Sequence, residues 1–225
     1  RRSIGAALGD ELLSVHGAGG AAGDDHSPLA KGVRRLRSVS LGLIAAGDPD
    51  RGAKLAKVQF DAADNMTDRQ GALGVLVSLE APERGQALDA FYSRYEGDPL
   101  VIDKWFALQA AAQRGETVDE VERLATHPAF TLQNPNRLRA LAGTFGFNHG
   151  AYHEASGRGY RFLADMILAA DRLNPQVAAR LVPPLGRWRR FDPGRSALMR
   201  HELERIVATP GLSRDVYEQA SKSLG

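Results

Sequence analysis

The chain has 225 residues, 43% of them hydrophobic, which is enough to bury a core without help from disulfides or metals. It contains no cysteine, which excludes disulfides, thiolate zinc sites and thiol nucleophiles, and its longest apolar runs fall far short of a membrane span. Its 29 basic and 27 acidic side chains are interspersed and leave a net charge of +2, which argues against a dedicated nucleic-acid surface.

The N-terminal residues have helical spacing from the first turn onwards. Ile4, Leu8 and Leu12 are four residues apart, and Val15 follows three residues later. We therefore expect the chain to begin inside a helix, as a piece of a longer protein. Residues 17–27 are rich in glycine, alanine and aspartate, have no period and contain no G-x-x-x-x-G-K phosphate loop. They are expected to form a flexible loop.

Proline placement marks the starts of the later helices. Six prolines follow a Ser, Asp or Asn, and a capping side chain before a first-turn proline is a helix-start signal. These prolines are Pro28, Pro49, Pro99, Pro135, Pro175 and Pro193. Thr67 with Gln70, and Thr117 with Glu120, have the spacing of capping boxes for two further helices. Helix ends are expected at Gly47, Gly97 and Gly115.

Between these signals the apolar residues recur with helical periods. Val101, Trp105 and Leu108 are one example, and no segment competes as a strand. The sequence therefore predicts an all-α fold of about a dozen helices in antiparallel pairs. The pairs recur at about 40 residues, as in HEAT or ARM arrays, so we expect a curved superhelix that forms a single domain over residues 1–225.

Two basic clusters stand out along the chain. Arg34, Arg35 and Arg37 flank apolar residues of one helical period and are expected on the solvent side of that helix. Residues 187–191 (RWRRF) interleave arginines with aromatic side chains, a pattern that also occurs in nucleic-acid binding. Because the overall charge is nearly balanced, we interpret this run as Trp188 packing beside solvated arginines.

Candidate catalytic groups are few. No H-E-x-x-H motif of zinc peptidases and no G-x-S-x-G nucleophile elbow occurs in the sequence. His149, His153 and Glu154 have a spacing that could hold a metal if they lay on a helix. Glycines and polar residues surround them, so we expect an irregular polar connection. A self-sufficient hydrolase built on these three residues is kept as a minor alternative.

Two segments begin with Asn-Pro and carry arginines in their first turns, residues 134–139 (NPNRLR) and 174–180 (NPQVAAR). At a helix start the positive end of the dipole adds to their charge, which costs stability and suggests a function. Guanidinium groups near helix N-termini bind carboxylates well, for example the C-terminus of a peptide. The alternative, that the arginines pair with acidic residues of neighbouring helices, is equally open.

Several short strings of residues in these regions carry a resemblance. They are residues 64–68 (DNMTD), 102–106 (IDKWF), 130–131 (FT) with 134–137 (NPNR), 174–178 (NPQVA) with 180–181 (RL), and 215–218 (DVYE). Together, in this order and at these intervals, they resemble the bacterial-type alanyl aminopeptidases (aminopeptidase N), a family of gluzincin zinc peptidases. The resemblance runs from about Arg34 to the end of the chain.

The resemblance implies that the chain is the C-terminal domain of a four-domain exopeptidase, a helical superhelix that caps the catalytic domain and encloses its chamber. The zinc and the catalytic residues would lie in the catalytic domain, so this chain would hold no metal and have no activity alone. The residues that correspond to Arg139, Gln176 and Arg180 are expected to line the chamber and to help bind peptide.

The implied partners are the catalytic domain of the same chain and peptide substrates, with no nucleic acid and no membrane. Cytoplasmic residence is expected from the resemblance and from the absence of cysteine. The main alternative is a free-standing helical-repeat scaffold that binds another protein and has no enzymatic role.

Overall fold

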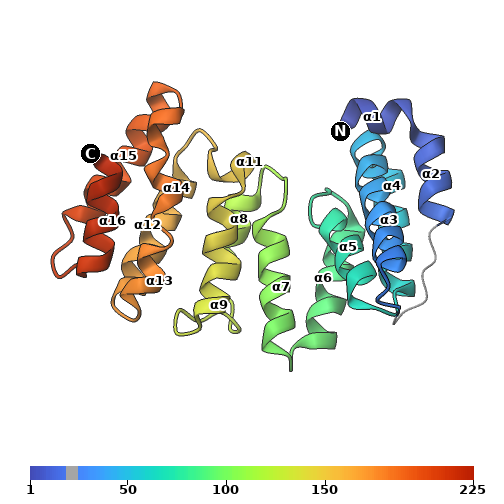
Figure 1. The fold of residues 1–225 in the computed structure, drawn as a ribbon, viewed down its shortest axis with the longest axis horizontal. Helices are drawn as coiled ribbons and strands as arrows, with labels where there is room; N and C mark the ends of the chain where they lie inside the picture. The colour runs from blue at the N-terminus through green and yellow to red at the C-terminus, as the bar shows by residue number, and fades with distance from the viewer. Residues whose placement is uncertain (19–24) are drawn as a thin grey trace. The chain divides into compact units, whose positions relative to one another are not determined.

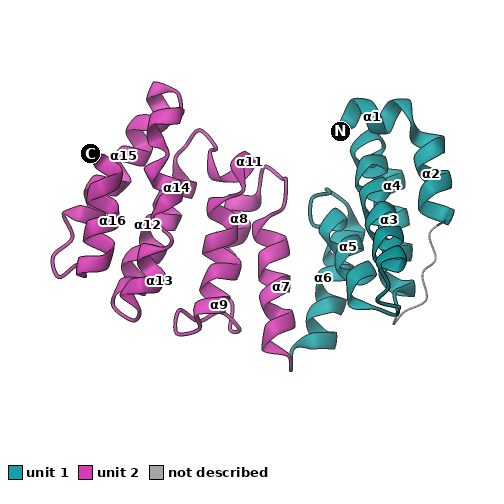
Figure 2. Ribbon diagram, viewed as in Figure 1, with its two compact units in different colours: residues 1–97 teal, residues 98–225 magenta. Residues whose placement is uncertain are grey.

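The computed structural model describes residues 1–18 and 25–225, and every regular element within these ranges is a helix (Figure 1). The all-α prediction is confirmed. The chain divides into two compact units, residues 1–97 and 98–225 (Figure 2). None of the described helices combines the length and the hydropathy that a membrane span needs.

The described residues of the first unit form six helices. They are α1 (Arg2–Ala7), α2 (Gly9–Ala18), α3 (Pro28–Gly47), α4 (Pro49–Ala62), α5 (Met66–Leu76) and α6 (Pro82–Tyr95). Of the predicted loop at residues 17–27, residues 19–24 lie outside the described part, and Gly17 is the penultimate residue of α2.

The second unit begins at Asp98 and contains several helices of only one turn. Its elements are α7 (Pro99–Ala110), α8 (Thr117–Leu124), α9 (Pro135–Leu138), the π-helix η1 (Arg139–Gly143), α10 (Thr144–Gly146), α11 (His149–Tyr152), α12 (Arg158–Asp171), α13 (Pro175–Ala179), α14 (Pro183–Gly186), the 3-10 helix η2 (Trp188–Arg190), α15 (Pro193–Val207) and α16 (Arg214–Leu224).

The six predicted proline starts are all confirmed, because each proline is the first residue of its helix and the preceding Ser, Asp or Asn accepts a backbone N–H bond. The two capping boxes are wrong. Asn65 caps α5, with its side-chain oxygen 2.9 Å from the backbone nitrogen of Asp68, and Asn is a better cap than Thr. The Thr117 hydroxyl instead donates to the carbonyl of Ala112 at 3.0 Å.

In the first unit, α1 and α2 pack on α3, and α3 packs on α4 and α5. Helix α1 crosses the end of α3 so closely that a side chain at Gly5 would overlap the carbonyl of Leu43 and lie 2.8 Å from the nitrogen of Gly47. Gly47 also ends α3, as predicted. Only glycine at both positions permits this backbone contact.

A buried polar network corrects the prediction for the first basic cluster. Arg34 is only 4% exposed, and Arg37 forms an ion pair with Asp68 at 3.6 Å, whereas Arg35 is exposed. The Gln59 amide donates to the carbonyl of Asp68 at 3.0 Å. Arginines therefore lie on the interior side of α3, because the interfaces of α3 with α4 and α5 offer them polar partners.

The second unit has two layers of helices. One layer contains α7, the α9–η1–α10 segment, α13–α14 and α16, and the other contains α8, α12 and α15. In Figure 1 the first layer runs upward and the second runs downward, so successive helices are antiparallel. Large side chains without exposed surface fill the core of this unit: Phe106, Leu141, Phe145, Tyr152, Tyr160, Leu163 and Met199.

Candidate binding site

The three residues proposed from sequence, Arg139, Gln176 and Arg180, come from neighbouring segments in one layer of the second unit. Each segment starts with an Asn-Pro pair. Asn134 Oδ1 accepts the backbone N–H of residue 136 at 2.9 Å, and Asn174 Oδ1 accepts that of residue 177 at 3.2 Å. A capped first turn with a fixed proline φ holds the residues that follow in a defined position.

Arg137 has a structural role. Its guanidinium group is buried, forms an ion pair with Asp103, donates to the carbonyls of Ala129 and Pro99, and lies 5.0 Å above the ring of Phe106. Arg137, on α9, therefore holds α9 against α7 and against the connection that precedes α9. For Arg137, the alternative of pairing with an acidic residue on a neighbouring helix is confirmed.

Arg139, two residues further on, is exposed and differently engaged. Its side chain donates to the carbonyl of Pro135 at 3.3 Å and to the side-chain oxygen of Asn136, and none of the described carboxylates forms an ion pair with it. Arg139 is also the first residue of the π-helix η1. Such wide turns are rare and occur frequently at functional sites.

Gln176 and Arg180 are exposed at the two ends of α13. Arg180 is the C-cap, so the prediction that it lies in the first turn of a helix is wrong, and the helix dipole favours its charge there. Within the described ranges, neither side chain forms a hydrogen bond or an ion pair. Both side chains therefore keep their full hydrogen-bonding capacity, an amide with donors and an acceptor and a guanidinium fork with five N–H donors.

Gly143 brings the two segments together. A Cβ placed on Gly143 would lie 3.6 Å from the Cβ of Arg139 and 3.6 Å from a methyl group of Leu181, so the end of η1 contacts the residue after Arg180. The layer thus presents two arginines and one glutamine from adjacent segments. Such groups suit peptide carbonyls and carboxylates, since guanidinium–carboxylate bonds are among the stronger hydrogen bonds in proteins.

The candidate metal trio has other engagements. Glu154 accepts bonds from the hydroxyl and the backbone nitrogen of Ser156 and from the backbone nitrogen of Arg158, so it stabilises the start of α12. His149 begins the short helix α11 and His153 caps it, so the expectation of an irregular connection is only partly met. Across the described ranges, no group of three His, Asp or Glu side chains is arranged to hold a metal.

His153 is held as a neutral ring. Its Nδ1 lies 2.9 Å from the hydroxyl of Tyr160, and its ring stacks on Phe191 with 3.9 Å between centroids. Burial, followed by the charges of His149 and Arg195, lowers the pKa of His153 to about 4. His153 therefore packs at the edge of the core, bonded to Tyr160 and stacked on Phe191.

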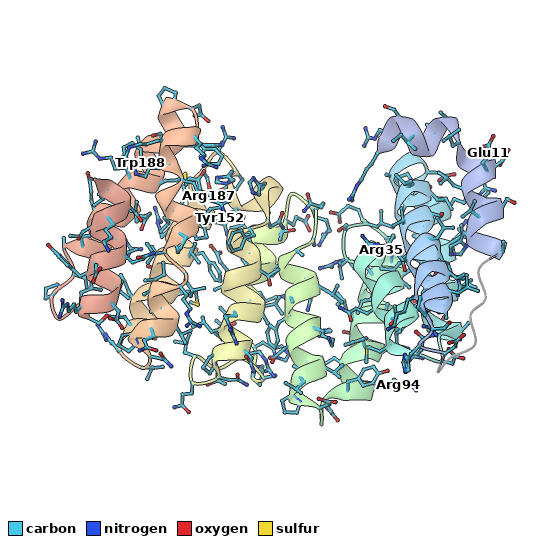
Figure 3. All side chains as sticks on the ribbon, viewed as in Figure 1. Glu11, Arg35, Arg94, Tyr152, Arg187 and Trp188 are labelled. Carbon is cyan, nitrogen blue, oxygen red and sulfur yellow. The ribbon has the colours of Figure 1, made fainter. Side chains whose placement is uncertain are left out.

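The basic and aromatic run at residues 187–191 is a helix cap. The indole nitrogen of Trp188 donates to the carbonyl of Ser223 at 2.9 Å, and Arg189 donates to the carbonyl of Leu224 at 2.7 Å. These bonds satisfy carbonyls at the end of α16 that would otherwise lack partners. Figure 3 labels Trp188 and Arg187 at this end of the unit, and Arg187 lies 5.4 Å from the ring of Phe147. The packing interpretation of Trp188 is confirmed.

One cavity was not expected from the sequence. It has a volume of about 220 Å³, lies in the first unit, and is lined by Phe60, Asp61, Arg69, Ala90 and Arg94. Arg69 is already bonded to the hydroxyl of Tyr95 at 2.8 Å and to the carbonyl of Ala63. The residues that line the cavity come from three different helices, α4, α5 and α6, and share no motif, so no sequence signal could have identified it.

Comparison with known proteins identifies the family of this chain. Residues 1–225 match the family described as "Domain of unknown function (DUF3458_C) ARM repeats". The chain is 45% identical to aminopeptidase N of Caulobacter vibrioides over 100% of the chain and 26% of that protein. It is 38% identical to aminopeptidase N of Escherichia coli strain K12 over 99% of the chain and 26% of that protein.

Among solved structures, a crystal structure of Legionella pneumophila aminopeptidase A in complex with aspartic acid is similar, with a TM-score of 0.89 and 31% identity. The match covers 99% of this chain and 27% of that chain. The chain therefore spans about a quarter of the length of the curated relatives it matches.

Proposed function

The chain belongs to the DUF3458_C family of ARM-repeat domains, and we propose that it is the C-terminal domain of a zinc-dependent aminopeptidase that removes N-terminal residues from peptides. Its relatives named aminopeptidase N align with it over its whole length and are about four times longer. In this proposal the domain caps the catalytic part of the same polypeptide and helps to enclose the chamber where peptides are cleaved.

The zinc would be held outside this chain. The described residues do not fit a zinc site, because the Glu154 carboxylate is bonded to the start of α12 and the His153 Nδ1 to Tyr160. When bound in the catalytic part, zinc would activate the water that attacks the first peptide bond. The domain would contribute binding and enclosure.

Arg139, Gln176 and Arg180 would bind the peptide. The observation that carries this role is that two exposed arginines lie on neighbouring segments of one layer, without a described carboxylate partner. The other partner is the catalytic part of the polypeptide. Nucleic acid and membrane surfaces are disfavoured by the near-balanced charge, and we propose the cytoplasm as the compartment because the chain lacks cysteine.

The first test measures hydrolysis of alanine 4-nitroanilide together with zinc content. The complete protein should turn over the substrate and contain zinc, whereas the 225-residue chain should do neither. Zinc-dependent turnover by the chain alone would contradict the proposal and would direct attention to His149, His153 and Glu154. A complete protein without aminopeptidase activity would also contradict it.

The second test is Arg139→Ala in the complete protein, assayed on a tetra-alanine peptide. We expect KM to rise and kcat to change little, because the lost contact would bind the substrate and the transition state equally well. The loss in kcat/KM should be roughly tenfold, the effect of about 1.4 kcal/mol. Alanine 4-nitroanilide has no residues beyond the first, so under this proposal it should be hydrolysed normally.

The matched control is Arg161→Ala. Arg161 is also an exposed arginine and lies on α12, in the other layer of the same unit. It should leave both constants unchanged for both substrates. If Arg139→Ala behaved like the control on the peptide, the role of this layer in peptide binding would be wrong.

A further inference from the structure

One side of α3 is apolar and uncovered. Leu29, Leu36 and Val39 are 78%, 55% and 42% exposed, although large apolar side chains on a 20-residue helix are normally buried. Leu29 and Leu36 are seven residues apart, and Leu36 and Val39 are three apart, so the three side chains share one side of the helix.

Two glycines on the same side of α3 leave open space above the backbone. A Cβ added at Gly32 or at Gly42 would meet no atom within 4 Å. Glycine is less favourable than alanine inside a helix, and none of the described residues fills the space that it leaves. Glycine at these two positions allows the backbone of another segment to approach α3 closely.

The uncovered side also carries a positive charge. Arg35, labelled on α3 in Figure 3, is exposed, and its side chain forms no ion pair or hydrogen bond with a described residue. It is three residues from Gly32 and four from Val39, which places it beside them. A partner for this surface therefore combines an apolar segment with a carboxylate close to Arg35.

We propose that this surface, the α3 face (Leu29, Gly32, Arg35, Leu36, Val39 and Gly42), docks against the remainder of the same polypeptide. The proposal rests on the proposed function. The chain spans 26% of its relatives aminopeptidase N, so about three quarters of the polypeptide lies outside it and must contact it somewhere. Exposed patches of this kind mark contact surfaces.

A second copy of the chain is a poorer occupant. A symmetric pair would press the same patch against itself, because both partners of a two-fold dimer use one surface. Arg35 would then lie in an interface with a like charge and without a carboxylate. The remainder of the polypeptide is free of this restriction, since its docking surface has a sequence of its own.

The test uses cysteine labelling in the complete protein, because this chain has no cysteine of its own to interfere. Leu36→Cys reports on the α3 face. Val58→Cys is the matched control, since Val58 is 66% exposed but lies on α4 between exposed Lys54 and Asp61. Maleimide modification of each peptide is followed by mass spectrometry and normalised to the rate in urea.

Cysteine at position 36 should react at least tenfold more slowly than cysteine at position 58 in the native complete protein. Val39→Cys repeats the measurement on the same face if Leu36→Cys folds poorly. Equal rates at positions 36, 39 and 58 would overturn the docking proposal, and protection that disappears on dilution would assign the face to a second copy. Aminopeptidase activity of the same samples reports separately on the proposed function.

Discussion

At the scale of single residues, the burial of His153 makes the free energy of unfolding depend on pH. Its pKa is lowered from 6.5 to about 4 by burial and by nearby positive charge, so between these pH values the unfolded chain binds a proton that the folded chain does not. The free energy of unfolding should therefore fall as the pH drops from about 6.5 towards 4. Because the ring is only partly buried, we expect a loss of about 1–2 kcal/mol.

The measurement is urea unfolding at pH 7.5 and pH 5.0 for the natural chain and for His153→Phe, which keeps a ring against Phe191 but cannot titrate. His16 and His127 also have lowered pKa values, so the natural chain contains other contributions. The difference between the two chains isolates His153. An identical pH dependence in both would show that His153 does not contribute.

Residue roles were the part that sequence could predict least. Arg137 and Arg139 stand in the same Asn-Pro segment, and sequence reasoning left open whether they pair or bind. Two residues along a helix turn the side chain by about 200°, so one arginine reaches Asp103 and the other faces solvent. The same limit explains Arg34, because a helical period does not tell which polar residues find buried partners.

At the scale of elements, the cap of α5 provides a direct comparison of two adjacent signals. Asn65 accepts the backbone N–H of Asp68, whereas Thr67 is exposed inside the helix. Asn65→Ala should lower the free energy of unfolding by about 1 kcal/mol, the typical cost of a lost cap. Thr67→Ala should change it by less than about 0.5 kcal/mol. Thermal unfolding of both variants checks this, and a larger loss for Thr67→Ala would restore the capping box.

Helix starts were predictable because their chemistry is local. A capping side chain followed by proline satisfies free N–H groups within four residues, and all six such starts are present. The π-helix at Arg139–Gly143 was not predicted, since no local signal specifies an extra residue in a turn. Its wide turn lies where Gly143 meets Leu181, a contact between segments far apart in sequence.

At the scale of the whole molecule, the family resemblance is confirmed, because it depended on strings of residues spread along the chain. The helical pairs were also predictable, from the helix-start signals and the apolar periods between them. The single domain over residues 1–225 stays a prediction. The structure divides the same residues into two compact units, and helical periods contain no information on how cooperatively such units unfold.

A matched pair of core substitutions decides that question. Leu73 on α5 and Leu163 on α12 are both fully buried, one in each unit, and replacing either with alanine should cost about 2–5 kcal/mol. Native-state hydrogen exchange would then be measured helix by helix. Because each unit has its own buried core, we expect Leu73→Ala to accelerate exchange in residues 1–97 and Leu163→Ala in residues 98–225. If either substitution accelerated exchange equally in both units, the chain would unfold as one cooperative domain, as the sequence predicts.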